Sequence, residues 1–366
     1  MRSAKIHFIT GLRRDFGGKP FILAHALAIL SARLAYPDHE ILVHFEHEPA
    51  GPFWAFAKAQ VTCVHVSAPT EVFGRPIANY AHAADLLRLR ILVEQGGIYF
   101  DLDTMVIRRV DDLPADRVVM GLEVHRGGAT VGLCNAFIAA PPGSAFLRAW
   151  LDSYSDFDAG DWNKHSVRRP FELVQQFPAL VHVAPQSAFF SPGWDKESLK
   201  DLFERCVDVS GAYSTHLWES LSWSYLSSLT VARIACEDTT FNLCARSVLA
   251  AFPALADCAP PVGREWHVRI VLDRSSLPVG ATDRAPFWYV GFHDADGAEI
   301  ARCDADHREL RRVLTADGDS VVLERTFVAS RRPARWTVWP TDRARRWLGP
   351  LSGPVDPTEP ADRAAA

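Results

Sequence analysis

The sequence predicts an α/β core followed by a smaller β-rich appendage. Over the first 250 residues, short apolar runs alternate with longer apolar stretches of helical length, which is typical of a parallel-rich sheet. Beyond a Pro- and Gly-containing stretch at residues 259–263, only short runs of strand length remain. We therefore expect a core domain over residues 1–258 and a β-sandwich-like domain over residues 263–345. Residues 346–366, rich in Pro, Gly, Ala and charge, are expected to be a disordered tail.

The first elements of the core follow from apolar runs and the residues that interrupt them. Residues 5–10 are expected to form a strand, and residues 21–34 a helix that Pro20 opens at its first turn and Tyr36-Pro37-Asp38 ends. The remaining strands of the core are expected at residues 41–45, 61–66, 118–122 and 134–139, and its remaining helices at residues 143–154 and 231–249.

The centre of the core carries the clearest local signals. A mostly apolar helix is expected over residues 81–95, and Gly96-Gly97 ends it because glycine adopts positive φ at little cost. An apolar strand over residues 98–102 then leads directly into acidic residues.

The appendage is expected to contain strands at residues 267–272, 287–292, 321–328 and 336–339. Asp294-Ala295-Asp296-Gly297 is a turn signal between strands. This region is rich in aromatic residues, namely Trp266, Trp288, Tyr289, Trp336 and Trp339. We expect these aromatic residues to form the core of the domain, and the alternative is that they form a carbohydrate-binding or partner-docking surface.

Composition excludes several classes of protein. The chain has 366 residues, 48% of them hydrophobic, and a net charge of −5, which argues against a nucleic-acid partner. Seven scattered cysteines without a Cys-x-x-Cys pair favour reduced thiols over a zinc ribbon or a disulfide framework. No apolar run reaches the length of about 18 residues that a membrane-spanning helix needs, and the first residues lack the apolar run of a signal peptide. We expect a cytoplasmic protein, with peripheral contact at the inner face of the membrane left open, and the Arg- and Ala-rich composition favours a bacterial source.

Asp101 and Asp103 are the main candidates for a reactive centre. They follow the strand at residues 98–102, and alternate residues of a strand point to the same side, so the two carboxylates should converge beyond its carboxyl end. Two anions this close repel each other unless a cation lies between them, and hard oxygen ligands suit Mg²⁺ or Mn²⁺. An isolated Asp-x-Asp is more often a turn or a helix cap, and here the preceding helix, Gly-Gly and strand favour a metal and diphosphate site.

Asp85 and Arg88 lie three residues apart on the predicted helix, so they share one face among apolar neighbours. Buried charges need partners. They form either an intrahelical salt bridge or a pair of groups that bind the hydroxyls of a sugar.

These residues together resemble the glycosyltransferases with a DXD sugar-binding region, a family that includes capsular-polysaccharide and mannosyl transferases and is related to the glucosylating domains of clostridial toxins. The matching positions are Asp85, Arg88, Leu92, Gly96, Gly97, Tyr99, Asp101 and Asp103. Weaker likenesses occur at residues 5–9, 135–143 and 189–194, and at His216-x-Trp218, so the resemblance extends over about residues 5–225 and leaves out the appendage.

The resemblance implies a GT-A fold, a UDP- or GDP-sugar donor, Mn²⁺ or Mg²⁺, and transfer to a glycan, lipid or protein acceptor with retention of anomeric configuration. It implies that Asp103 ligates the metal and that Asp101 contacts the donor and, through water, the metal. It implies that Asp85 and Arg88 bind the donor sugar. His216 would complete the metal shell or contact the diphosphate, and the alternative is a core histidine. Asn135 would line the acceptor side or belong to a turn. Trp223 would line the site or belong to the core.

Three other functions fit parts of the sequence. A Mg²⁺-dependent phosphatase of the haloacid-dehalogenase type also places Asp-x-Asp after an apolar strand. However, its motif lies on the first strand of its domain, and Met105 stands where that class has Thr or Val. A carbohydrate-binding protein is the second alternative. A third is a degenerate transferase that only binds, and the complete set of Asp85, Arg88, Asp101 and Asp103 argues against this third alternative.

Overall fold

A computed structural model describes residues 5–14, 19–258, 264–273, 275, 277, 288–297, 299–305, 311–315, 318–329, 332–340 and 350–355. The chain divides into two compact units, Met1–Ala259 and Pro260–Ala366. Within the described residues, no helix is both long and apolar enough to span a membrane.

The first unit is built on a seven-stranded mixed sheet with the strand order β10-β8-β9-β6-β1-β2-β3. Its strands are β1 (Ile6–Ile9), β2 (Ile41–Phe45), β3 (Thr62–His65), β6 (Gly97–Phe100), β8 (Val118–Val124), β9 (Thr130–Ala140) and β10 (Val181–Ala184). All neighbouring strands are parallel except that β9 runs antiparallel to both β6 and β8. The expected parallel-rich α/β core is therefore confirmed.

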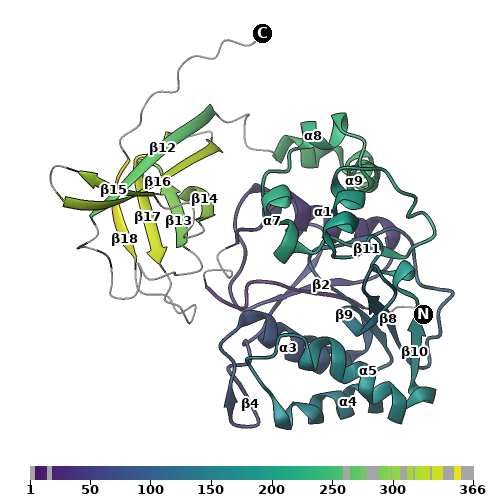
Figure 1. Ribbon diagram of the computed structural model, residues 1–366. Coiled ribbons are helices and arrows are strands. Elements are labelled where there is room, and N and C mark those ends of the chain that lie inside the picture. Colours follow the sequence, from purple (N-terminus) through teal and green to yellow (C-terminus); the bar gives the residue numbers. More distant parts are fainter. Residues whose placement is uncertain are drawn as a thin grey trace. The chain divides into compact units, whose positions relative to one another are not determined.

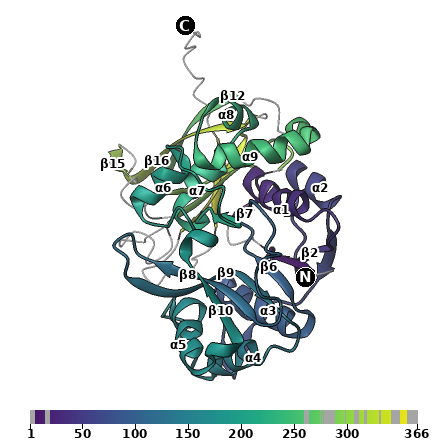
Figure 2. The ribbon, with the colours of Figure 1, turned by 90° about the vertical axis from the view of Figure 1, so that its right-hand side faces the viewer.

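Helices cover both faces of this sheet (Figures 1 and 2). One face carries α1 (Leu23–Ala35), α2 (Pro52–Lys58), α7 (Glu219–Ser227) and α9 (Thr240–Ala251), and the other carries α3 (Tyr80–Gln95), α4 (Ala145–Asp152) and α5 (Arg169–Gln176). Shorter elements are α6 (Lys196–Phe203), α8 (Val231–Cys236) and the two-stranded pairs β4 (Glu71–Val72) with β5 (Arg75–Pro76) and β7 (Thr104–Val106) with β11 (Ser214–His216). Two hydrophobic clusters, one on each face, result from this layering.

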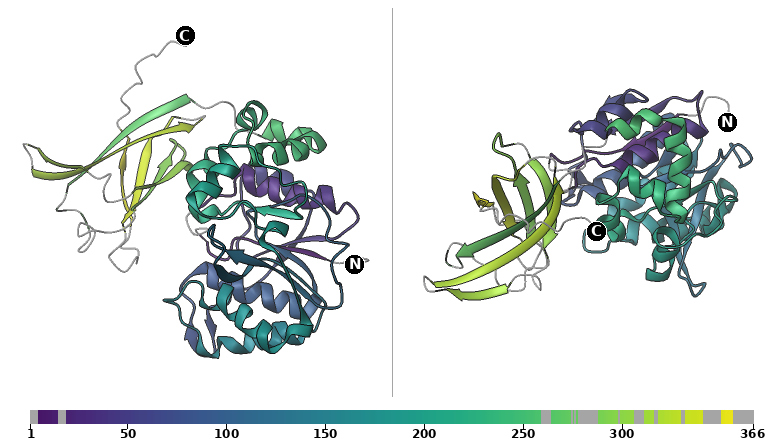
Figure 3. Two further views of the ribbon diagram at one scale, coloured as in Figure 1. Left: turned by 45° about the vertical axis from the view of Figure 1, so that its right-hand side comes forward. Right: turned by 90° about the horizontal axis from the view of Figure 1, so that it is seen from above.

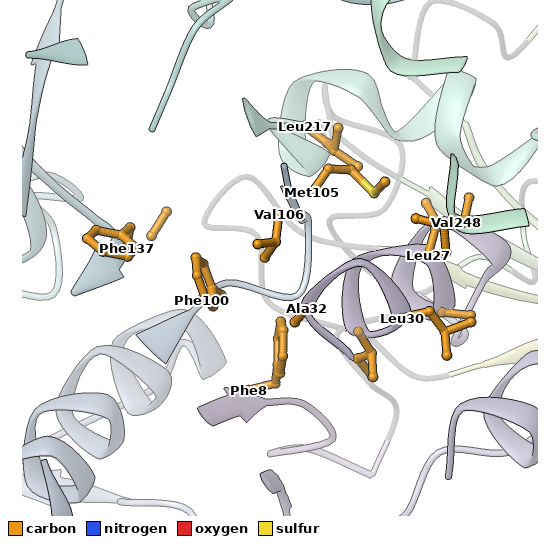
Figure 4. Close-up of a cluster of buried hydrophobic side chains, with 14 of the residues drawn as sticks. Phe8, Leu27, Leu30, Ala32, Phe100, Met105, Val106, Phe137, Leu217 and Val248 are labelled. Carbon is orange, nitrogen blue, oxygen red and sulfur yellow. The ribbon is translucent and has the colours of Figure 1, made fainter. Parts of the chain in front are cut away.

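The cluster on the α1 face fixes the chain that follows β6 (Figure 4). Phe8 of β1 and Phe100 of β6 stack with ring centroids 6.1 Å apart, and Met105 and Val106 of β7 are buried beside α1. The amide of Val106 donates to the Ser31 hydroxyl of α1 at 2.8 Å. The segment between β6 and β7 is therefore tied at both ends to the core.

The junction between α3 and β6 has the form that the sequence predicts. Asn79 caps α3 by accepting from the Ala81 amide at 2.9 Å, and Gly96 and Gly97 have φ values of 64° and 104°. A Cβ atom on Gly97 would lie 2.3 Å from the carbonyl oxygen of Lys5 on the neighbouring chain segment. Only glycine fits here, so the helix ends and β6 enters the sheet next to β1.

Two predictions for the helices need correction. The single helix expected over residues 231–249 is wrong, because α8 ends at Cys236 and α9 begins after Thr239. Thr239 has extended backbone and its hydroxyl accepts from the Asn242 amide at 3.1 Å, so a local cap interrupts the apolar pattern. The helix expected over residues 143–154 ends at Asp152 and continues as a 3₁₀ turn, Ser153–Asp156.

The second unit contains two antiparallel sheets, with the orders β12-β16-β15 and β14-β13-β17-β18 (Figure 3). Its strands are β12 (Arg264–Asp273), β13 (Trp288–His293), β14 (Glu299–Ala305), β15 (Arg311–Thr315), β16 (Gly318–Ala329), β17 (Arg335–Pro340) and β18 (Leu351–Pro354). Apolar residues from both sheets, such as Ile270 and Leu323 from one and Val290 and Val338 from the other, form one shared core. The unit is thus β-sandwich-like, and Gly297, with a φ of 82°, closes the expected turn between β13 and β14.

The tail expected to be disordered from residue 346 is corrected over residues 351–354. These residues form β18, which pairs with β17, and Gly353 lies against the Trp336 ring where a Cβ atom would be only 2.5 Å from it. Trp288 and Trp336 are buried in the shared core, and Tyr289 and Trp339 form an edge-to-face pair with ring centroids 6.4 Å apart. The side chain of Trp266 lies outside the described residues.

Candidate active site

A turn places the two aspartates that follow β6. The amide of Asp101 donates to Ala136 of β9 at 2.8 Å, and the amide of Thr104 donates back to the carbonyl oxygen of Asp101 at 3.0 Å. The carboxylates are therefore presented by a turn between β6 and β7, whereas strand alternation was the reason for expecting them together. One ligand atom each from Asp101, Asp103 and His216 nevertheless lies within 4.8 Å of the others.

Asp103 joins this cluster to the start of α7. Its Oδ1 lies 3.0 Å from His216 Nε2, and its Oδ2 accepts from the Glu219 amide at 2.7 Å. Trp218, the residue before α7, has left-handed backbone with φ 53° and makes no side-chain cap, so Asp103 caps this helix from a distant part of the chain. Burial by itself would raise the pKa of Asp103, but His216 and the Glu219 amide outweigh burial and lower it.

Asp101 lies between the Arg88 guanidinium on one side and Asp103 on the other. Its Oδ1 accepts from the Tyr99 hydroxyl at 2.6 Å and pairs with Arg88 Nη1 at 2.9 Å. Burial raises the pKa of Asp101, and Asp103 adds to the rise while Arg88 opposes it. Burial by itself would lower the pKa of His216, but the Asp103 carboxylate outweighs burial and raises this pKa.

Arg88 connects Asp101 to Asp85. Its Nη2 lies 3.2 Å from Asp85 Oδ1, and its Nη1 also donates to the carbonyl oxygen of Asn135 at 2.8 Å. The Asn135 amide donates to Asp85 Oδ1 at 2.7 Å. The intrahelical salt bridge is therefore present, but it is one part of a buried network that α3, β6 and β9 build together.

A cavity of about 510 Å³ opens over this network. Six of the predicted site residues line it, namely Asp85, Arg88, Asp101, Asp103, Asn135 and His216. Trp223 is not among its lining residues, and its ring instead lies 5.0 Å from the Lys19 ammonium group. The predicted acceptor contact of Trp223 has no support from this cavity.

Several lining residues were not among those predicted. Glu123 at the end of β8 is buried, and burial raises its pKa. Glu219 at the start of α7 pairs with Lys19 at 2.9 Å and with His25 at 2.9 Å, and these partners lower its pKa although burial opposes them. The tryptophans that line the cavity are Trp162, Trp194 and Trp218. Glu219 follows the His-x-Trp segment directly, so this motif could have indicated it, whereas no local pattern indicates Glu123 or Trp162.

Comparisons with known proteins agree with this geometry. Residues 26–120 match the family described as "Glycosyltransferase sugar-binding region containing DXD motif". The chain is 36% identical over 250 residues to glucan organizing enzyme 1 of Cryptococcus neoformans var. grubii, covering 65% of this chain and 68% of that protein. It is 26% identical over 107 residues to the O-glycosyltransferase braB of Annulohypoxylon truncatum, covering 27% of this chain and 25% of that one.

Solved structures that match parts of this chain include the PaToxG glycosyltransferase, with 22% identity, 48% of this chain and 70% of that chain covered, and a TM-score of 0.36. Another is the apo form of the glycosyltransferase GlyE of Streptococcus pneumoniae TIGR4, with 10% identity, 68% and 64% covered, and a TM-score of 0.39.

The chain belongs to the family of glycosyltransferases whose sugar-binding region contains the DXD motif. The enzyme is thus a glycosyltransferase, and the phosphatase and the non-catalytic carbohydrate-binding protein are set aside. A bacterial source stays a prediction, because a fungal protein is among the relatives.

Proposed function

We propose that this enzyme moves a sugar from a UDP- or GDP-sugar to a glycan, lipid or protein acceptor, that it depends on Mn²⁺ or Mg²⁺, and that it retains the anomeric configuration. The observation that carries the proposal is the convergence of Asp101, Asp103 and His216 at the cavity, beside the network of Asp85 and Arg88. A glycan acceptor is in keeping with the name of the Cryptococcus relative, which refers to glucan.

The residues fit a divalent cation. Two carboxylates and one imidazole form a mixed oxygen and nitrogen ligand set, which Mn²⁺ accepts more readily than Mg²⁺ does. Both bonds of Asp101 to its neighbours use Oδ1, and His216 Nδ1 is buried without a partner among the described residues. The ring faces Asp103 Oδ1 through Nε2, so this nitrogen is the atom suited to ligate a cation together with the two carboxylates.

When bound, the metal would neutralise the charge that develops on the departing diphosphate. The residues of the chain position the sugar beside it. Asp85 accepts hydrogen bonds from sugar hydroxyls through its Oδ2, while Arg88 and Asn135 hold its Oδ1 in place. Asp101 sits close to the reacting carbon, and its negative charge stabilises a transition state with oxocarbenium character.

The test is release of free nucleotide from a panel of UDP- and GDP-sugars, with Mn²⁺, with Mg²⁺ or with chelator. We expect metal-dependent release from one donor and a loss of at least about 100-fold in Asp103→Asn. The matched control is Asp116→Asn, because Asp116 is exposed and lies outside the cavity lining. Release that is unchanged by chelator would refute the metal dependence, and the anomeric form of the released sugar, read by NMR, tests retention.

A cytoplasmic location with peripheral membrane contact is also part of the proposal. Fractionation of the source cells into soluble and membrane pools tests it, and secreted protein would contradict it.

A further inference from the structure

A single exposed tryptophan stands at the edge of the cavity. Trp162 is 56% exposed and lines the same cavity as Asp85 and Asn135. Of the nine large hydrophobic residues exposed in the described part of the chain, Tyr80, Trp162 and Leu221 line this cavity. Exposed apolar surface that gathers beside a polar cavity marks a binding site more often than chance exposure does.

Trp162 lies in a loop whose two ends are buried in the core. The chain enters the loop at buried Phe157 and leaves it through a π-helical turn, Lys164–Arg168, whose His165 is also buried. The Trp150 indole donates to the carbonyl oxygen of His165 at 2.7 Å, and the Ser166 hydroxyl donates to the carbonyl oxygen of Trp162 at 3.1 Å. The backbone that carries the indole is therefore held by the buried side chains of Trp150 and Ser166.

The π-helical turn also packs closely against β9, the strand that carries Asn135. A Cβ atom on Gly132 of β9 would lie 2.4 Å from the carbonyl oxygen of Val167, so only glycine permits this approach. Ion pairs of Arg169 and Lys164 with Asp156, at 2.6 Å and 3.3 Å, tie the turn to the start of the loop. An extra residue per turn is costly in a helix, and such turns are frequent at functional sites.

Trp162 lies at one end of a chain of contacts that starts at the metal ligands. Arg88 links Asp101 to Asp85, His82 Nδ1 lies 3.7 Å from Asp85 Oδ2, and the His82 ring lies 5.4 Å from the Trp162 ring. A ligand that places its phosphate at the metal ligands and its hydroxyls at Asp85 thus has the indole at its outer end. Asn163 and Ser166 line the cavity beside the indole and offer polar groups there.

From this arrangement we propose that Trp162 is the platform of a pyranose-binding subsite. The C–H face of a sugar ring packs on the indole while its hydroxyls reach Asn163, Ser166 and Asp85. This combination of one flat apolar surface and convergent polar groups suits a sugar, which has both kinds of surface. The ring belongs either to the donor or to a glycan acceptor, and in either case the proposal rests on the proposed function.

The experiment compares affinities of wild type, Trp162→Ala, Trp162→Phe and Phe73→Ala by calorimetry with Mn²⁺ present. The probes are a panel of UDP- and GDP-sugars, UDP and GDP alone, and gluco- and manno-hexaoses added with UDP or GDP. Phe73 is the matched control because it is 60% exposed, aromatic and absent from the cavity lining. Calorimetry and the thermal transition of each variant show whether the fold is intact.

We expect Trp162→Ala to weaken binding of one probe that carries a sugar by about 10-fold, with Trp162→Phe close to wild type and Phe73→Ala unchanged. A loss confined to the nucleotide-sugars assigns the platform to the donor, and a loss confined to a hexaose assigns it to the acceptor. Weaker binding of UDP or GDP alone would overturn the proposal, because the indole would then stack on the base. Unchanged affinity for every probe would also overturn it. If wild type binds a hexaose through Trp162 but no nucleotide-sugar, the platform stands and the proposed donor falls.

Discussion

Replacement of Asp103 separates two tasks that the structure gives to one carboxylate. Asp103 Oδ2 caps α7 through the Glu219 amide at 2.7 Å, and Oδ1 faces His216 Nε2 at 3.0 Å in the cluster of ligand atoms. Asparagine keeps a carbonyl oxygen for the Glu219 amide, and its NH₂ group donates to His216 once that imidazole is neutral at Nε2. Alanine removes both bonds.

The expected magnitudes follow from these contacts. Loss of a helix cap costs about 1 kcal/mol, and loss of the buried partner of His216 adds about another 1 kcal/mol. Asp103→Ala should therefore lower the free energy of unfolding by about 2 kcal/mol, while Asp103→Asn should stay within about 0.5 kcal/mol of wild type. Both variants should lose at least about 100-fold in metal-dependent nucleotide release, since asparagine does not supply the anionic ligand.

Urea unfolding, followed by a probe in the first unit, measures the stability difference, and the nucleotide-release assay measures turnover on the same preparations. Equal destabilisation of the two variants would show that the cap contributes little. Normal turnover in Asp103→Asn would remove the carboxylate from the metal site. In either case the reasoning from these two bonds would be refuted.

Three further outcomes are expected. His7 Nδ1 and His44 Nε2 lie 3.0 Å apart in the sheet, and burial lowers the pKa of each histidine from 6.5 to about 4. Because the unfolded chain binds more protons below pH 6.5, the free energy of unfolding should fall by about 2 kcal/mol per histidine from pH 7 to pH 5. A free energy of unfolding that does not change with pH, measured by urea unfolding, would contradict this. Gly97→Ala should leave little soluble protein, because its Cβ would meet the Lys5 carbonyl oxygen at 2.3 Å, and wild-type yield with an unchanged thermal transition would disprove it. Arg88→Met leaves the Asp85 and Asp101 carboxylates without their shared cation, so it should lower the free energy of unfolding by about 3 kcal/mol. A double variant that also carries Asp85→Asn should recover part of this loss, and no recovery would show that the unpaired carboxylates are not its cause.

Local signals were sufficient for the central segment. The apolar helix, Gly96-Gly97 and the apolar strand predicted α3, the positive φ values and β6, because each depends on residues adjacent in sequence. They also predicted where Asp101 and Asp103 lie, although a turn and not strand alternation brings the carboxylates together. The break at Thr239 was missed because the apolar pattern continues across it, and only the cap hydrogen bond ends the continuity.

Long-range packing determined what the sequence did not show. Glu123 enters the cavity because β8 lies beside β9 and parallel to β10, a neighbourhood that no local pattern contains. Trp162 is one of eleven tryptophans, and its exposure depends on buried contacts of Trp150 and Gly132. The capping of α7 by Asp103 joins residues more than a hundred positions apart.

The reversed direction of β9 has a consequence for which loop near the aspartates can change in length. Because β9 alone runs antiparallel, the hairpin at residues 125–129 that joins it to β8 lies at the same edge of the sheet as Asp101. Gly127 and Gly128 in this hairpin have open space around them, so insertions there meet no packed neighbour. Longer or different hairpins can thus be accommodated next to Glu123, which lines the cavity, while the strand register and the aspartates stay in place.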